Sequence, residues 1–114
     1  MVFMIRSEHD SEGRVLPPET REEIIELLQS HRRELDELGV TRLSLFGSAA
    51  RGTLTPQSDV DMVVEFSQIT YRRFVALKAF LESILGRKVD LLTPAAVQGR
   101  LKEEIEKDLV HVPT

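Results

Sequence analysis

Apolar residues recur along the chain with two spacings, that of a helix (about 3.6 residues) and that of a strand (about two residues). The helical spacing is found in the first third of the chain. One stripe of apolar residues recurs at helical spacing among charged neighbours: Ile24, Leu28, Leu35 and Leu38. Thr20, followed three residues later by Glu23, matches the capping box that begins a helix. Gly39 is a typical C-terminal stop. The pattern predicts one continuous helix between Thr20 and Gly39, preceded by a loose lead-in over residues 1–18.

Three segments show the two-residue period of a strand, in which alternate side chains face opposite sides of a sheet. The first covers residues 41–46, and the third covers residues 88–92, where Asp90 is flanked by apolar side chains. The second covers residues 59–66 and divides into two sets: Val60, Met62, Val64 and Phe66 on one face, and Asp59, Asp61 and Val63 on the other. We therefore expect three strands that each bury an apolar face.

The rest of the chain adds two helices and one short strand. Residues 71–85 carry an apolar stripe and end at Gly86. Thr93-Pro94 has the form of an N-cap and first-turn proline, and the helix expected after it has three apolar residues on one side: Leu101, Ile105 and Leu109. A short strand is expected at residues 110–112. The order predicts a single α/β domain over residues 1–114, with a small mixed sheet flanked by helices.

The composition bounds the class of protein. Of 114 residues, 41% are hydrophobic and 30% are charged, which is enough for one core and excludes a disordered chain. The net charge of -4 argues against a broad nucleic-acid-binding face, which would be basic. Cysteine is absent from the sequence, so neither a disulfide nor a thiolate zinc site is possible. The N-terminal apolar run ends at Arg6, too soon for a signal peptide or membrane span, and we expect a soluble, cytoplasmic protein.

Three aspartates interrupt the apolar strands: Asp59, Asp61 and Asp90. An unpaired charge on a sheet is costly to desolvate, and a divalent cation compensates that cost. Asp59 and Asp61 share a face, so they can hold one ion or a close pair of ions, and Asp90 completes the site if its strand is a neighbour. Hard oxygen ligands without His or Cys favour Mg²⁺ or Mn²⁺ over zinc. Asp90 can also assist deprotonation of an attacking hydroxyl.

A Gly47-Ser48 turn separates the first predicted strand from a short helical turn. Backbone N–H groups at such a place bind phosphate oxygens, Gly47 permits close approach, and the Ser48 hydroxyl can add a hydrogen bond. The turn is not a Walker A loop, because the Gly-Lys-Ser/Thr ending is absent. Arg51 is expected either to steady phosphate charge or to anchor the loop through a carboxylate. A carboxylate cluster beside a phosphate-binding turn points to nucleotidyl transfer.

Each of these features has a simpler structural explanation when it is taken alone. A Gly-Ser turn is more often only a turn, and Asp-x-Asp is often an exposed strand face. Arg51 can form a surface ion pair, and Asp90 can be solvated at a strand end. The order and spacing of all four features together favour the functional interpretation.

The segment from Gly47 to Asp61 resembles a known family. Gly-Ser-Ala-Ala-Arg-Gly is followed, after five residues, by Ser-Asp-Val-Asp, and a third carboxylate lies about thirty residues downstream. This combined motif resembles the DNA polymerase β-like nucleotidyltransferase superfamily and, within it, the minimal nucleotidyltransferase (MNT) group. The resemblance covers nearly the whole chain and implies a polymerase β-like palm fold.

The resemblance also implies roles for individual residues. Gly47 and Ser48 would hold nucleotide phosphates, Asp59 and Asp61 would bind Mg²⁺, and Asp90 would complete the catalytic and metal-binding carboxylates. The other nucleotide-binding residues expected are Arg51 and Ser58. The implied substrate is ATP, with two Mg²⁺ ions.

MNT proteins occur as antitoxins beside HEPN ribonuclease toxins, and the resemblance implies transfer of AMP from ATP to a tyrosine of such a toxin. A domain this short has little material for a template- or base-reading lobe, so we expect acceptor specificity to come from docking a partner. We expect an oligomer or hetero-complex, with neither membrane nor direct nucleic-acid binding.

Two alternatives stay open from the sequence. One is a non-catalytic antitoxin that occludes its toxin by binding, although a pure binder does not need three carboxylates. The other is a small-molecule nucleotidyltransferase, which usually requires an additional substrate-binding domain.

Overall fold

The computed structural model describes residues 17–113, so most of the expected lead-in lies outside the described residues. The helices are α1 (Arg21–Ser30), α2 (Arg32–Glu37), α3 (Gly47–Arg51), α4 (Tyr71–Leu85), the 3₁₀ turn η1 (Pro94–Ala96) and α5 (Gly99–Asp108). The strands are β1 (Val40–Phe46), β2 (Val60–Phe66), β3 (Val89–Leu92) and β4 (Val110–His111). They form one sheet in the order β3-β2-β1-β4, with β2 and β3 parallel and the other pairs antiparallel. This confirms the predicted small mixed α/β sheet.

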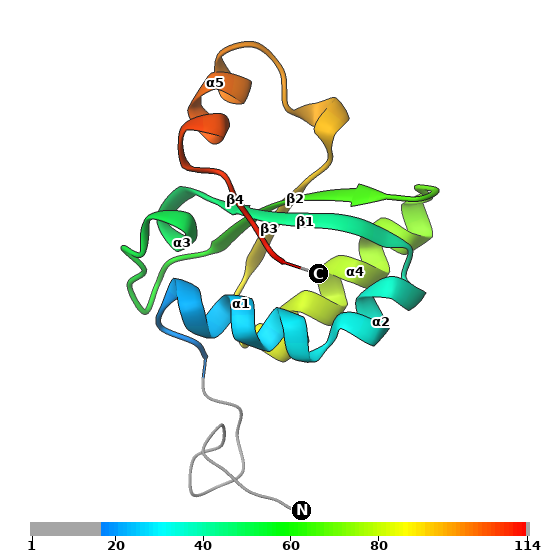
Figure 1. Ribbon diagram of the computed structural model, residues 1–114, viewed down its shortest axis with the longest axis horizontal. Helices are drawn as coiled ribbons and strands as arrows, with labels where there is room; N and C mark the ends of the chain where they lie inside the picture. Colours follow the sequence, from blue (N-terminus) through cyan, green and yellow to red (C-terminus); the bar gives the residue numbers. More distant parts are fainter. Residues whose placement is uncertain (1–16, 114) are drawn as a thin grey trace, which may run out of the picture.

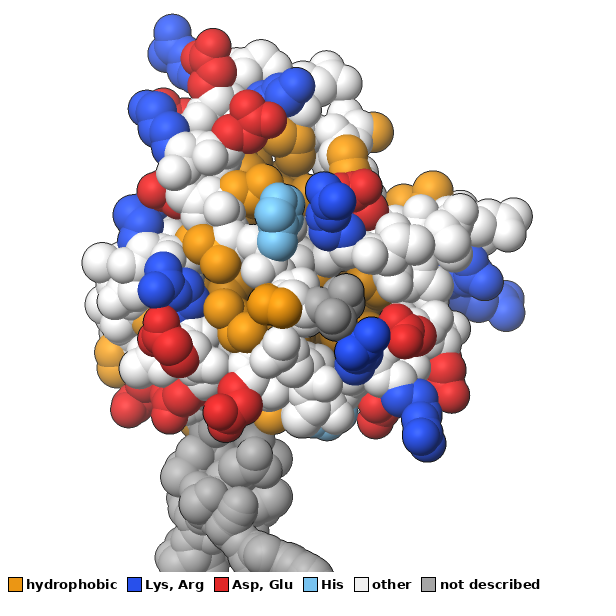
Figure 2. Space-filling view, viewed as in Figure 1, with side chains coloured by type: hydrophobic (Ala, Val, Ile, Leu, Met, Phe, Trp, Pro, Cys, Tyr) orange, Lys and Arg blue, Asp and Glu red, His pale blue; other side chains and the backbone are white. Residues whose placement is uncertain are grey.

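The sheet has one covered face and one more open face. Helices α1, α2 and α4 lie on the covered side, and α5 and η1 lie on the other side (Figure 1). The core forms between the sheet and the first group of helices, with fully buried side chains from both: Ile24, Leu28, Leu45, Val60, Met62, Val64, Leu77 and Leu81. On the face seen in Figure 2, acidic and basic side chains are interspersed around apolar ones. None of the helices in residues 17–113 is long and apolar enough to cross a membrane.

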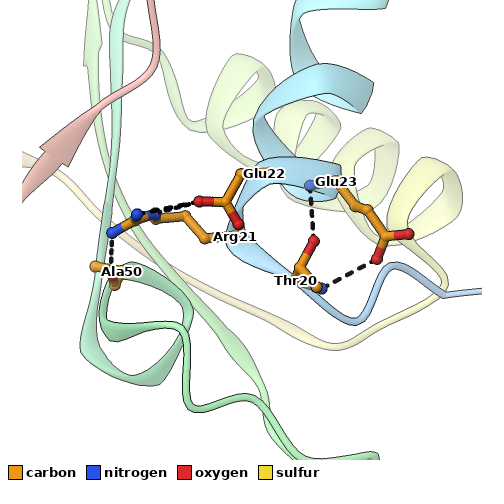
Figure 3. Close-up of polar contacts among 5 residues, drawn as sticks. All are labelled: Thr20, Arg21, Glu22, Glu23 and Ala50. Atoms are coloured by element: carbon orange, nitrogen blue, oxygen red, sulfur yellow. Dashed lines mark hydrogen bonds and ion pairs between the residues drawn. The ribbon is translucent and has the colours of Figure 1, made fainter.

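The start of α1 agrees with the predicted capping box. The Thr20 hydroxyl accepts a hydrogen bond from the Glu23 backbone N–H at 3.1 Å, and the Glu23 carboxylate accepts one from the Thr20 N–H at 3.1 Å (Figure 3). The prediction of one continuous helix up to Gly39 is wrong, because the helix breaks at His31 (φ −109°, ψ 23°). The side chains of Ser30 and His31 both contact the Leu27 carbonyl, at 2.6 and 3.0 Å. Such side-chain bonds compete with the helical hydrogen bonds of the backbone.

The second half of the chain follows the expected pattern, except at the last helix. Helix α4 has the predicted bounds and ends at Gly86 in the left-handed conformation (φ 62°). The last helix does not begin at Thr93: its side chain makes no capping hydrogen bond, and extended Val97 separates η1 from α5. Of the apolar stripe predicted here, Ile105 is buried, whereas Leu101 is 45% exposed.

Candidate active site

The two faces of β2 separate the core from the candidate site. Val60, Met62 and Val64 are fully buried on the covered face, as the two-residue period predicts. Asp61 alternates with them and is half-buried on the other face, while Asp59 is exposed directly before the strand. The apolar face therefore fixes the position of the strand, and the aspartates are displayed at its beginning.

The register between β2 and β3 places Asp61 and Asp90 side by side. Val60 pairs with Val89 and Asp61 with Asp90 in a parallel ladder. Paired residues of neighbouring strands point to the same side of the sheet and are roughly 4.8 Å apart along the hydrogen-bonding direction. Asp90 is exposed, whereas its neighbours Val89 and Leu91 are buried. The third carboxylate thus shares a face with Asp61, although it lies 29 positions later in the sequence.

The electrostatics of Asp61 reflect its burial and the two other carboxylates. Burial raises the pKa of Asp61 above its ordinary value, and the negative charges of Asp90 and then Asp59 raise it further, while Arg51 acts in the opposite direction. A carboxyl beside two like charges resists ionisation. A bound cation would relieve this repulsion.

The donor set fits a hard divalent cation, because it consists of carboxylate oxygens, the ligands that such cations prefer. As the side chains lie, no three Asp, Glu or His residues among residues 17–113 converge closely enough to share one ion. Asp59 and Asp90 are both exposed, so their carboxylates have room to turn toward Asp61. The backbone brings the three aspartates near one another, and their carboxylates would share one ion only after side-chain rotation.

The Gly47 turn adjoins these carboxylates. Phe46 pairs with Asp61 across β1 and β2, so the chain enters α3 beside that aspartate. Gly47 has φ 66°, and a Cβ added there would collide with the Asp61 carboxylate oxygen. Phe46 provides no side-chain cap for α3, which leaves the first N–H groups of the helix without that partner. Only glycine combines this backbone conformation with this approach.

Two other predicted nucleotide-binding residues make contacts within the chain. Arg51 forms an ion pair with Asp108 at the end of α5, with 2.8 Å between Nη1 and Oδ2. The Ser58 hydroxyl accepts a hydrogen bond from the Thr55 N–H at 2.9 Å and closes the turn before Asp59. Arg51 thus contacts a carboxylate of α5, and Ser58 shapes the loop that carries the first aspartate; nucleotide binding by both residues stays a prediction.

A groove of about 410 Å³ lies on the same open side of the sheet. Its floor includes Ser44 of β1 and Val63 of β2, and Ile105 of α5 forms part of its roof. Val63 follows Asp61 on the same face, so the groove begins next to the carboxylates. The site is thus bounded by the Gly47 turn at one end and by this groove at the other.

Sequence reasoning assigned no role to two arginines that hold the loops of this site. Arg21 of α1 donates to the Ala50 carbonyl of α3 at 2.9 Å (Figure 3). Arg87 donates to three carbonyls, two of them in the turn before Asp59. Their acceptors are backbone atoms distant in sequence, which leave no motif or spacing for a sequence pattern to detect.

Comparison with known proteins agrees with this geometry. The family model for the nucleotidyltransferase domain matches residues 28–112. The chain is 36% identical over 95 residues to the protein adenylyltransferase MntA of Thermococcus cleftensis, covering 82% of this chain and 96% of that protein.

Two solved structures have a similar fold. A minimal nucleotidyltransferase superposes with a TM-score of 0.69 at 28% identity, over 83% of this chain and 96% of that one. The complex of the tri-AMPylated HEPN toxin of Shewanella oneidensis with an MNT antitoxin matches with a TM-score of 0.52 at 20% identity, over 82% of this chain and 68% of that one. At that identity the second similarity concerns the fold alone.

Proposed function

The chain belongs to the nucleotidyltransferase domain family, and we propose that it is an antitoxin that transfers AMP from ATP to a tyrosine of a HEPN ribonuclease toxin. One observation carries the proposal: the β2–β3 register sets Asp61 beside Asp90, next to the close approach of Gly47. A protein that acted only by binding would not need this arrangement. The complex of an AMPylated HEPN toxin with an MNT antitoxin, similar in fold, supports the class of partner.

The residues of the chain have separate roles in the proposed reaction. The uncapped N–H groups at the start of α3 and the Ser48 hydroxyl bind the phosphates of ATP. The tyrosine Oη attacks the α-phosphorus; an O–P bond forms there, and the bond from the α-phosphorus to the pyrophosphate oxygen breaks. Asp90 is exposed on the shared face, so its carboxylate is accessible to accept the tyrosine proton.

Asp59, Asp61 and Asp90 would hold Mg²⁺. When bound, Mg²⁺ neutralises charge on the transferring phosphoryl group and on the leaving pyrophosphate. The raised pKa of Asp61 supports this assignment, because its causes, burial and then the negative charges of Asp90 and Asp59, are ones that a bound cation offsets. The groove beside Val63 leaves room on the open side of the sheet for an acceptor side chain.

The direct test combines the protein, ATP and Mg²⁺ with the product of the adjacent gene. We expect intact-mass spectrometry to show the addition of AMP units to that product, and tandem mass spectrometry to locate them on a tyrosine. Omitting Mg²⁺ should abolish the mass gain. A neighbour that stays unmodified while its toxicity is still neutralised would contradict adenylyl transfer.

A variant pair separates an enzyme from an antitoxin that acts only by binding. Asp59→Asn with Asp61→Asn should abolish both the mass gain and the neutralisation of the toxin. Asp36→Asn with Glu37→Gln is the matched control, because it removes two neighbouring exposed carboxylates from α2, on the covered side of the sheet (Figure 1). If the double variant neutralises the toxin as well as the control does, binding alone is the mechanism.

A further inference from the structure

We propose that Arg87 is a positioning residue that holds Asp59 in place through the turn that precedes it. The inference rests on the proposed function, in which Asp59 is a metal ligand. The Arg87 side chain is half-buried and donates from Nη1 to the carbonyls of Thr55 and Ser58, each at 2.9 Å. Its Nε donates to the Pro18 carbonyl, also at 2.9 Å.

The loop between α3 and β2 has little else to hold it. Most of residues 52–59 are exposed, and Leu54 is the apolar side chain that packs against the core. The Ser58 hydroxyl closes a local turn with the Thr55 N–H, but that bond lies within the loop and does not attach it to the fold. The Arg87 guanidinium supplies the attachment, directly before Asp59.

Arg87 also joins this loop to the strand of the third carboxylate. It lies between the end of α4 and the start of β3, three residues before Asp90. The Val60 N–H donates to the neighbouring Lys88 carbonyl at 2.9 Å, so β2 and β3 begin side by side at this point. The guanidinium therefore adds a connection, beside the ladder, between the two chain segments that deliver Asp59 and Asp90.

The contacts of Arg87 indicate that it positions the loop through hydrogen bonds and does not act by placing its positive charge beside an acidic group. All three acceptors are neutral carbonyls, and three N–H bonds from two nitrogen atoms need the planar fork of a guanidinium. A lysine at this position keeps the charge but cannot make the same set of bonds. Arg87→Lys should therefore recover only part of what Arg87→Met loses.

The test measures binding of Mn²⁺ to the full-length protein in the presence of AMP-PNP, by electron paramagnetic resonance. Arg87→Met should weaken Mn²⁺ binding about ten-fold, as is typical when a residue supporting a metal ligand is lost. Raising Mg²⁺ should restore part of the lost rate of AMP transfer, while the circular dichroism spectrum stays that of the folded protein, because refolding driven by the cation would also raise the rate. Arg73→Met is the matched control, because Arg73 donates to a loop carbonyl, Gln68, at the other end of β2 (2.7 Å).

Each outcome decides the proposal. Equal Mn²⁺ affinities for the Arg87→Met and Arg73→Met variants would overturn it. If Arg87→Met does not fold, Mn²⁺ binding is measured on Arg87→Lys instead. Wild-type Mn²⁺ affinity in Arg87→Lys would overturn the proposal that the guanidinium positions Asp59. If the wild-type protein binds Mn²⁺ but transfers no AMP, adenylyl transfer is wrong, while the Mn²⁺ comparison still tests Arg87.

Discussion

The two faces of β2 differ in burial and in charge: one is apolar and buried in the core, and the other carries a partly exposed carboxylate. On the covered face, Met62 is fully buried between the helices and its neighbouring strands. On the open face, Asp61 is half-buried and its pKa is raised by burial and by two other carboxylates. The covered face stabilises the fold, and the open face carries charge at a cost to stability. A substitution on one face should therefore affect activity or stability, but not both equally.

The largest effect is expected for Asp90→Asn on the open face. Loss of the proton acceptor should lower the rate of AMP transfer by on the order of 10³-fold. Asp90 is exposed, so the free energy of unfolding should change by less than about 0.5 kcal/mol. Single-turnover kinetics and urea unfolding measure the two quantities. A variant that retains the wild-type rate would remove Asp90 from the chemistry.

The opposite result is expected for Met62→Ala on the covered face. A buried methionine replaced by alanine leaves a cavity and should cost about 3 kcal/mol of unfolding free energy. The transfer rate per folded molecule should stay close to that of the wild type. Val63→Ala, half-buried on the open face of the same strand, is the control and should cost less than half as much. Equal losses would mean that the two faces do not differ in this way.

Gly47 tests the contact between the phosphate turn and the carboxylates. Gly47→Ala and Gly52→Ala both place a side chain at positive φ (66° and 75°), and each should cost about 1–2 kcal/mol. A Cβ at Gly47 meets the Asp61 carboxylate, whereas one at Gly52 meets no atom of the described residues within 4 Å. We expect about a ten-fold loss of transfer rate for Gly47→Ala alone. Similar rates in both variants would show that the close approach is unimportant.

The smallest effect concerns the charge of Asp61. Its pKa is raised in the folded protein, so the folded state holds the proton more tightly than the unfolded chain does. Stability is therefore lost as the pH rises from the unfolded pKa through the folded pKa. Without divalent cations at pH 7, Asp61→Asn should stabilise the fold by on the order of 0.5 kcal/mol, after allowance for solvent screening. This gain should vanish below the unfolded pKa.

Thermal unfolding at several pH values measures that difference. Asp36→Asn in α2 is the control, because it removes an exposed carboxylate far from the site in sequence and should give no comparable gain. A destabilising effect of Asp61→Asn at pH 7 would mean that the carboxylate is well compensated within the fold.

The regular periods of the sequence predicted the strands and placed Asp61 and Asp90 opposite buried apolar side chains. That their strands are neighbours was a condition that the sequence left open, and the β2–β3 register fulfils it. The periods did not predict the helix break at His31, where two side chains contact one carbonyl. They also missed Arg87, because its role depends on carbonyls that only the folded chain brings together. The roles of the site residues in catalysis are still predictions.

Because β2 and β3 are connected through α4, Asp90 is the last of the three aspartates to be synthesised and placed in the sheet. Asp59 and Asp61 are synthesised before α4, and β3 can pair with β2 only after α4 has crossed the sheet. A nascent chain that ends before β3 therefore contains the glycine turn and two carboxylates but no third. If the proposed roles of the three aspartates hold, catalytic competence should consequently arise only once β3 has paired with β2.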